Sequence, residues 1–212
     1  MVVAIDGPAG TGKSSVSREV ANGTGFFYLN SGRFYRAITR NALLAGVRVE
    51  DREELLHVAR NTVIDVEGDV FIVDGTALDR ELHTPEIDEK VAQVSSLPEV
   101  REVVNTRLKE IAGLRDVVVE GRDMSTVVFP DADVKIFLDA DPAVRARRRF
   151  REQGGTGDLT ALEAAITERD RLDRTKDTGR LVRAPDAIYL DTTDLTLQQV
   201  CERVIAAIHE RN

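Results

Sequence analysis

The amino-acid sequence predicts an α/β fold in which helices cover both faces of a parallel central sheet. Short apolar runs alternate with amphipathic stretches along the 212 residues, and turn residues bound each apolar run. Parallel strands that are buried on both faces have such sequences, and the amphipathic stretches between them are typical of covering helices. The runs that we expect as strands are 2–6, 26–29, 117–120, 134–138 and 188–191.

Two of the expected helices have recognisable ends. Apolar residues recur at helical spacing over 34–45 and stop at Gly46, which can adopt the left-handed conformation of a helix C-cap. A second apolar stripe, over 197–208, follows Thr192 and Thr193, whose hydroxyl groups are suitable N-caps. We therefore expect one helix to end at Gly46 and a C-terminal helix to begin after these threonines.

Two segments interrupt the alternation of strands and helices. Residues 63–78 have nearly alternating apolar side chains around two glycine turns, which predicts an inserted β-hairpin. Residues 145–178 are rich in arginine, and the glycine-rich stretch 154–157 lies there between two helical patterns. This composition is typical of a mobile lid.

Size, charge and cysteine content limit the classes of protein to consider. A chain of 212 residues with 42% hydrophobic residues is enough for one well-buried domain with insertions. Its net charge of -8 argues against general binding to nucleic acid or to an anionic membrane, because both need a positive field. A lone Cys201 and the lack of a signal peptide or long apolar run are typical of the cytoplasm. We expect a cytoplasmic monomer in which Cys201 is buried.

One motif points directly to chemistry. Residues 7–14 match the phosphate-loop pattern G-x-x-x-x-G-K-[ST] between an apolar strand and a helical stretch. Glycines let the backbone surround a phosphate, and the N–H groups of the following helix point at the anion. Lys13 would supply charge to the β- and γ-phosphates, and the Ser14 hydroxyl would bind Mg²⁺. The sequence therefore predicts binding of ATP or GTP with Mg²⁺, through Gly7, Pro8, Ala9, Gly10, Thr11, Gly12, Lys13, Ser14 and Ser15.

A phosphate loop by itself does not separate a kinase from a GTPase switch or an ATP-driven motor. A GTPase would carry Asn/Thr-Lys-x-Asp, and the nearest candidate, 175–178, ends in Thr178 instead of Asp. A small-metabolite kinase of the shikimate or gluconate type would need the loop and the lid, but has little use for the hairpin over 63–78. Both remain alternatives to a nucleotide kinase.

Five segments carry a resemblance along nearly the whole chain. They are 5–14 (IDGPAGTGKS), 30–36 (NSGRFYR), 97–102 (LPEVRE), 120–130 (EGRDMSTVVFP) and 169–174 (RDRLDR), and they resemble the bacterial cytidylate kinase family. The resemblance implies transfer of the γ-phosphoryl group of ATP to CMP or dCMP, giving ADP and CDP or dCDP. It also implies a single kinase domain over 1–212, with a nucleoside monophosphate lobe over about 30–100 and an arginine-bearing lid over about 145–178.

The resemblance implies which residues recognise the base. Ser31, Arg101 and Asp123 would lie at the cytosine, with Arg101 donating to acceptors on the ring and Asp123 accepting from the amino group. A carboxylate accepts from N–H but cannot donate to the carbonyl that uracil has in the same place. Asp123 would therefore select CMP over UMP.

Other positions would bind the acceptor phosphate and sugar. Arg36 and Arg122 match positions that hold the monophosphate, since guanidinium groups make forked bonds to phosphate oxygens. Tyr35 would have a supporting role. Arg169 and Asp173 are four residues apart and share a helix face near the acceptor. An ordinary salt-bridged helix face is the alternative for these two residues.

The resemblance also suggests the catalytic residues. Lys13, Arg122 and a lid arginine would stabilise the transferring group, and among the arginines at 145 and 147–149 we favour Arg148. Glu120 would orient Mg²⁺-bound water or pair with an arginine. The sequence departs from the family pattern in four places, where Asn30 replaces Asp, Ala92 replaces Ser, Ser125 replaces Gly and Lys176 replaces Arg. Lys176 keeps the charge for phosphate binding but loses the fork.

Overall fold

The computed structural model describes residues 1–152 and 154–211. The chain forms two compact units: Met1–Phe27 together with the chain from Arg115 onward, which we call the core unit, and Tyr28–Leu114, which we call the inserted unit. The monophosphate lobe expected over 30–100 falls within the inserted unit, and the lid expected over 145–178 falls within the core unit. Gln153, inside that lid range, lies outside the described residues.

A parallel sheet organises the core unit. Strands β1 (Val2–Asp6), β6 (Val117–Gly121), β7 (Val134–Asp139) and β8 (Ile188–Asp191) pair in parallel in the order β6-β1-β7-β8. Strand β2 (Phe27–Asn30), where the chain passes into the inserted unit, precedes β6 in the five-stranded order. All five expected strands are present within one residue of their expected ends, so the α/β class with a parallel central sheet is confirmed.

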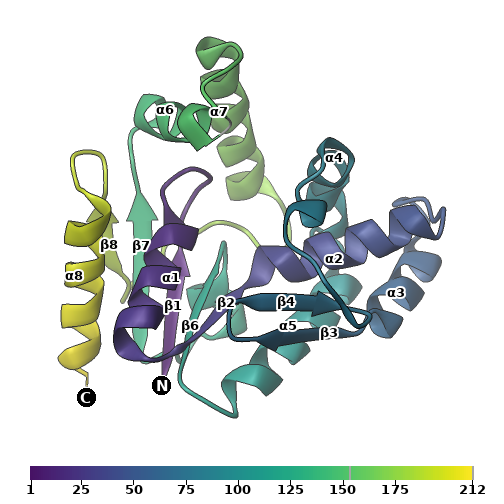
Figure 1. The fold of residues 1–212 in the computed structure, drawn as a ribbon, viewed down its shortest axis with the longest axis horizontal. Coiled ribbons are helices and arrows are strands. Elements are labelled where there is room, and N and C mark those ends of the chain that lie inside the picture. Colours follow the sequence, from purple (N-terminus) through teal and green to yellow (C-terminus); the bar gives the residue numbers. More distant parts are fainter. Residues whose placement is uncertain (153, 212) are drawn as a thin grey trace. The chain divides into compact units, whose positions relative to one another are not determined.

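Helices α1 (Lys13–Thr24) and α8 (Leu197–His209) lie side by side in front of the strands of the core unit (Figure 1). The C-terminal helix is confirmed, but its expected cap is wrong. The N-cap is Thr196, which accepts from the backbone N–H of Gln199 while the Gln199 side chain accepts from Thr196. Thr192 is instead buried, and its hydroxyl donates to the carbonyl of Asp139 at 3.1 Å.

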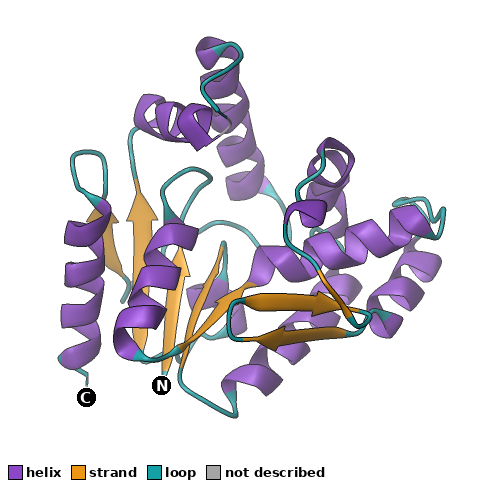
Figure 2. Cartoon of the chain, in the orientation of Figure 1, coloured by secondary structure: helices purple, strands orange, loops and turns teal. Residues whose placement is uncertain are grey.

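Beyond the carboxyl end of β7, two helices pack against each other within the core unit (Figure 2). They are α6 (Pro142–Glu152) and α7 (Leu159–Thr175), and they confirm the two helical patterns expected around the glycine-rich stretch. Asp158 caps α7 by accepting from the N–H groups of Thr160 and Ala161. The arginines of the expected lid therefore project from helices and not from an irregular loop.

The inserted unit contains four α-helices and a small sheet among its described residues. The helices are α2 (Ser31–Leu44), α3 (Arg52–Asn61), α4 (Pro85–Val94) and α5 (Pro98–Ala112), with a 3-10 turn, η1, at Arg80–Leu82. The antiparallel order β3-β4-β5 joins Ile64–Glu67, Val70–Val73 and Thr76–Ala77. The predicted hairpin over 63–78 is thus confirmed, with a third short strand added by the turn Asp74-Gly75, where both residues have positive φ (50° and 76°).

The two chain features that we expected at Gly46 and Cys201 are confirmed. Gly46 has a φ of 69°, and the N–H of Val47 donates to the carbonyl of Ala42 at 2.9 Å, which is the bond of a left-handed helix cap. Cys201 is buried, with its Sγ against the carbonyl of Val16. Among the residues that the structure describes, we find no helix with the length and apolarity that crossing a bilayer requires.

Candidate active site

The phosphate loop connects β1 to α1 in the core unit. Gly7 has a φ of +154°, and a Cβ there would lie 2.1 Å from the carbonyl oxygen of Leu138 on β7, so only glycine fits. Gly10 and Gly12 also have positive φ, at 77° and 88°. The N-cap of α1 is Gly12, and among the described residues no side chain caps the first N–H groups of this helix. The first N–H groups of α1 are therefore suited to an anion.

The side chain of Lys13 folds back onto the phosphate loop. Its Nζ donates to the carbonyl of Pro8 at 2.7 Å, and the residue is only 7% exposed. Burial lowers the pKa of Lys13 to about 7, and the positive charge of Arg122 adds to this, while Glu120 and Asp173 act in the opposite direction. The ammonium group is therefore poorly compensated, and a phosphate would restore its charge.

The end of β6 brings a carboxylate to the start of α1. Glu120 is buried, and its Oε2 accepts from the Ser14 hydroxyl at 3.1 Å. The register of β1 and β6 pairs Ile5 with Glu120, which places the loop and this carboxylate at the same edge of the sheet. Mg²⁺ prefers oxygen ligands of this kind and takes its others from phosphates and water. Ser14 and Glu120 therefore fit the expected magnesium site, and within the described ranges no group of three or more His, Cys, Asp or Glu side chains forms another.

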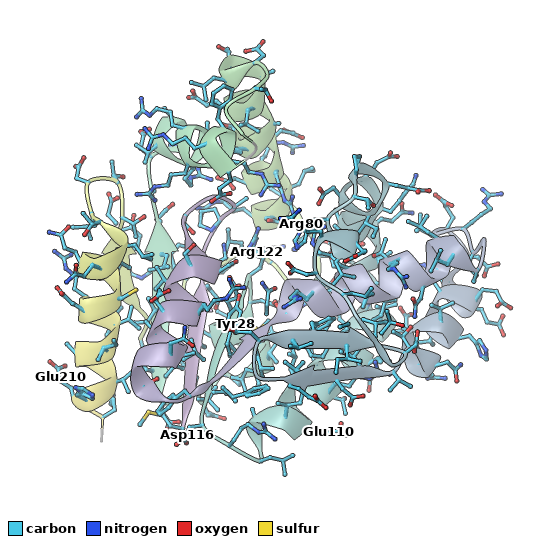
Figure 3. The ribbon with its side chains drawn as sticks, in the orientation of Figure 1. Tyr28, Arg80, Glu110, Asp116, Arg122 and Glu210 are labelled. Carbon is cyan, nitrogen blue, oxygen red and sulfur yellow. The ribbon has the colours of Figure 1, made fainter. Side chains whose placement is uncertain are left out.

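Three of the expected acceptor-binding residues meet in the core unit. Nε of Arg122 donates to Oδ2 of Asp173 at 2.8 Å, and Nζ of Lys176 donates to Oδ1 at 3.2 Å. Arg122 lies at the carboxyl end of β6, while Asp116, which pairs with the N-terminal ammonium group, lies at the opposite end (Figure 3). The predicted neighbours Arg122, Asp173 and Lys176 are thus brought together by α7 and by the turn after β6.

The charges around Asp173 separate it from an ordinary helix face. Burial alone would raise the pKa of Asp173, but Arg122, Lys176 and Arg169 outweigh it and lower the pKa to about 2. The ordinary pattern on the same helix is the exposed pair of Arg171 with Glu168. Asp173 instead pairs with a residue from another element.

A pH-dependent contribution to stability follows from this pKa. The pKa of Asp173 is about 2 in the fold against its ordinary value of 3.8, so its contribution is fully present above about pH 4 and is lost as the pH falls toward 2. We expect Asp173→Asn to lower the free energy of unfolding by about 2 kcal/mol at about pH 7, with the difference shrinking below about pH 4. Urea unfolding at several pH values measures it, with Glu168→Gln as the exposed control. A difference that does not depend on pH would contradict the assignment.

Arg148 and Arg145, two of the candidate lid arginines, bind different partners in this structure. The guanidinium group of Arg148 donates to Thr192, to the hydroxyl at 2.9 Å and to the carbonyl at 2.5 Å. Arg145, only 3% exposed, donates to the carbonyl of Ala9 in the phosphate loop at 3.0 Å and pairs with Asp170 of α7 at 2.6 Å. The contact of Arg145 with the loop was not predictable from the sequence, because the pattern of arginines on one helix does not indicate which of them faces the phosphate loop.

The inserted unit carries four further expected residues. Ser31, Tyr35 and Arg36 lie on α2, and the guanidinium carbon of Arg101 on α5 lies 5.6 Å from the centre of the Tyr35 ring. Arg36 donates to the carbonyl of Leu82 at 2.9 Å and to Asp88 at 2.5 Å. Tyr35 therefore contacts an expected base-binding arginine, which fits the supporting role.

Two of the four departures from the family pattern, Asn30 and Ala92, lie in this unit. Asn30 is the N-cap of α2, where its side chain accepts from the N–H of Arg33. Asparagine and aspartate are equivalent as N-caps, so the replacement keeps this function. Ala92 is exposed on α4.

Comparison with known proteins agrees with this geometry. The family described as cytidylate kinase matches residues 3–210. The chain is 43% identical over 211 residues to a cytidylate kinase of Caldanaerobacter subterraneus, which covers 98% of this chain and 94% of the relative. It is 45% identical over 214 residues to a cytidylate kinase of Streptomyces griseus, with 98% and 92% covered.

Solved structures give the same fold at lower identity. A shikimate kinase from Bacteroides thetaiotaomicron superposes with a TM-score of 0.51 at 13% identity, over 99% of this chain and 98% of that one. A gluconokinase from Sinorhizobium meliloti has a TM-score of 0.51 at 15% identity, over 99% and 91%. These two similarities show the fold alone, whereas the family match and the relatives above 40% identity extend over nearly the whole sequence. The chain therefore belongs to the cytidylate kinase family.

Proposed function

We propose that this protein transfers the γ-phosphoryl group of ATP to CMP or dCMP, giving ADP and CDP or dCDP. The observation that carries the proposal is the cluster in the core unit, where the buried Lys13 of the phosphate loop experiences the charges of Arg122 and Asp173. One group of the cluster belongs to the donor side and two belong to the acceptor side. Membership of the cytidylate kinase family supports the choice of acceptor.

The transfer requires positioning and charge stabilisation. A phosphate oxygen of the acceptor is already ionised near neutral pH, so no strong general base is needed. Lys13 would exchange the carbonyl of Pro8 for the β- and γ-phosphates, and Arg122, oriented by its bond to Asp173, would hold the acceptor phosphate. Mg²⁺ bound with ATP would neutralise charge on the phosphate oxygens, and Ser14 with Glu120 would hold it.

Three residues would recognise the base. Ser31, Arg101 and Asp123 would contact the cytosine, with Asp123 accepting from its amino group. Asp123 is buried, as a group that reads a substrate N–H should be. Arg36 and Lys176 would add charge for the acceptor phosphate, and Arg169 with Asp173 would lie near its sugar. We further propose that the protein acts as a cytoplasmic monomer on nucleotides only.

An acceptor panel tests the proposal. With ATP and Mg²⁺, we expect ADP formation with CMP and dCMP, less with UMP, and none above background with shikimate or gluconate. Omission of Mg²⁺ should abolish turnover, and its titration back should restore it. Equal activity with UMP and CMP would contradict the proposed base recognition, and activity with shikimate or gluconate alone would replace the proposal by a small-metabolite kinase.

The lid arginine that we favour gives a prediction of its own. Arg148 binds Thr192 in this structure, and we propose that it moves to the transferring phosphate when α6 and α7 close over the nucleotides. Arg148→Ala should lower kcat by about a hundredfold while CMP affinity changes by less than about threefold. Steady-state kinetics and CMP titration measure both. Arg151→Ala, on the exposed end of α6, is the matched control. An unchanged kcat would assign the role to another arginine.

A further inference from the structure

Asp6, the last residue of β1, is a buried acid to which the proposed mechanism gives no task. It is fully buried, and its carboxylate accepts three hydrogen bonds from a segment more than a hundred residues further along the chain. Oδ1 accepts from the N–H of Met124 at 2.8 Å, and Oδ2 accepts from the N–H of Ser125 at 2.7 Å and from its hydroxyl at 2.5 Å.

These bonds hold the start of a short π-helical turn, Met124–Val128. Inside the turn, the N–H of Val127 donates to the carbonyl of Asp123 at 2.9 Å. The N–H groups of Met124 and Ser125 are at the beginning of the turn, where a helical segment has no backbone acceptors for them. Asp6 therefore acts as the N-cap of this turn, although it belongs to β1, which is distant in the sequence.

Two residues with proposed acceptor roles lie directly before the turn that Asp6 holds. Arg122 and Asp123 immediately precede the turn, and the β1–β6 register pairs Asp6 with Gly121. Burial raises the pKa of the Asp6 carboxyl, while the hydrogen bonds from Ser125 and Met124 act to lower it. A buried carboxylate is costly to desolvate, so its placement beside the phosphate loop indicates a role beyond packing.

We propose that Asp6 is a positioning residue for the acceptor nucleotide, and that the Ser125 hydroxyl strengthens its hold on the turn that presents Arg122 and Asp123. The inference rests on the proposed roles of those two residues. Asp6 also directly precedes Gly7, and one strand end thereby sets the position of both the donor loop and the acceptor turn.

Substitution at both ends of the contact tests the inference. Ser125→Ala keeps the two backbone bonds and removes only the hydroxyl, and we expect the KM for CMP to rise about tenfold while the KM for ATP changes less than about twofold. Because Asp123 would shift with the turn, the ratio of CMP to UMP use should also fall. Asp6→Asn should lower kcat/KM for CMP by about a hundredfold or more, since its amide group cannot accept all three bonds.

Ser17→Ala is the matched control, because it removes a buried serine hydroxyl of the core unit that has no hydrogen-bond partner among the described residues. Thermal unfolding checks that each variant folds, and if Asp6→Asn does not fold, Ser125→Ala decides alone. A parent-like KM for CMP in Ser125→Ala, or equal rises in KM for CMP and ATP, would overturn the inference. If Arg122→Ala and Asp123→Ala impair CMP use while Ser125→Ala does not, only this inference fails. If Arg122→Ala and Asp123→Ala leave CMP use unchanged, the proposed site roles fail as well.

Discussion

Replacement of Lys13 by methionine is expected to reduce kcat by about a thousandfold or more without lowering the free energy of unfolding. The side chain is buried beside the positive charge of Arg122, and burial with this repulsion lowers its pKa to about 7. A lysine in that environment does not stabilise the fold, so its loss should leave stability unchanged or slightly higher. Its charge is needed when the β- and γ-phosphates of ATP are present, and methionine keeps the length of the chain without the charge.

Lys135 provides the matched control for this prediction. It is also buried, at 9% exposure, but its Nζ pairs with Asp186 at 2.7 Å. Lys135 lies near the start of β7, a strand that carries no proposed catalytic group. Lys135→Met should keep kcat near that of the parent, and it tests what the loss of a buried lysine does by itself. Initial rates of ADP formation and urea unfolding of both variants give the comparison. A Lys13→Met protein that is unfolded, or that retains full activity, would contradict the assignment.

Removal of the Asp123 carboxylate is expected to reduce the use of CMP far more than the use of UMP. A buried site that pairs with a substrate N–H rejects a substrate without that group, because the mismatch leaves polar atoms unsatisfied at about 1 to 3 kcal/mol each. Asp123 is 2% exposed, so water does not readily replace a lost partner. In Asp123→Ala, the ratio of kcat/KM for CMP to that for UMP should fall by about tenfold to a hundredfold.

Asp123→Asn makes the test directional. The amide can donate to the carbonyl that uracil has in place of the amino group, so this variant should use UMP better than Asp123→Ala does. Both variants are measured with CMP and UMP at saturating ATP, and circular dichroism confirms that each is folded. If kcat/KM falls by one common factor for both substrates, Asp123 has no part in base choice, and Ser31 and Arg101 are the next residues to replace.

The sequence was sufficient wherever a feature depends on neighbours along the chain. The five strands were predictable because buried parallel strands leave short apolar runs between turn residues. The phosphate loop was predictable because Gly7, Gly10 and Gly12 take backbone conformations that other residues rarely adopt. The end of α2 at Gly46 follows the same rule. The cap of α8 is also a local feature, formed by Thr196 and Gln199. Thr192 and Thr193 are equally suitable N-caps by residue type, so the sequence did not indicate which threonine begins the helix.

Only the tertiary structure decided which charged side chains meet. Arg145 and Arg148 are three positions apart on α6, and the packing of that helix, not the sequence pattern, directs Arg145 to the phosphate loop and Arg148 to Thr192. The contact between Asp6 and Ser125 spans 119 residues, and it exists because β1 and β6 end in register at one edge of the sheet. Local patterns determine turns, strands and phosphate-binding glycines through short-range sterics. Contacts between distant polar groups depend on how the strands and helices pack, which the sequence around either residue does not contain.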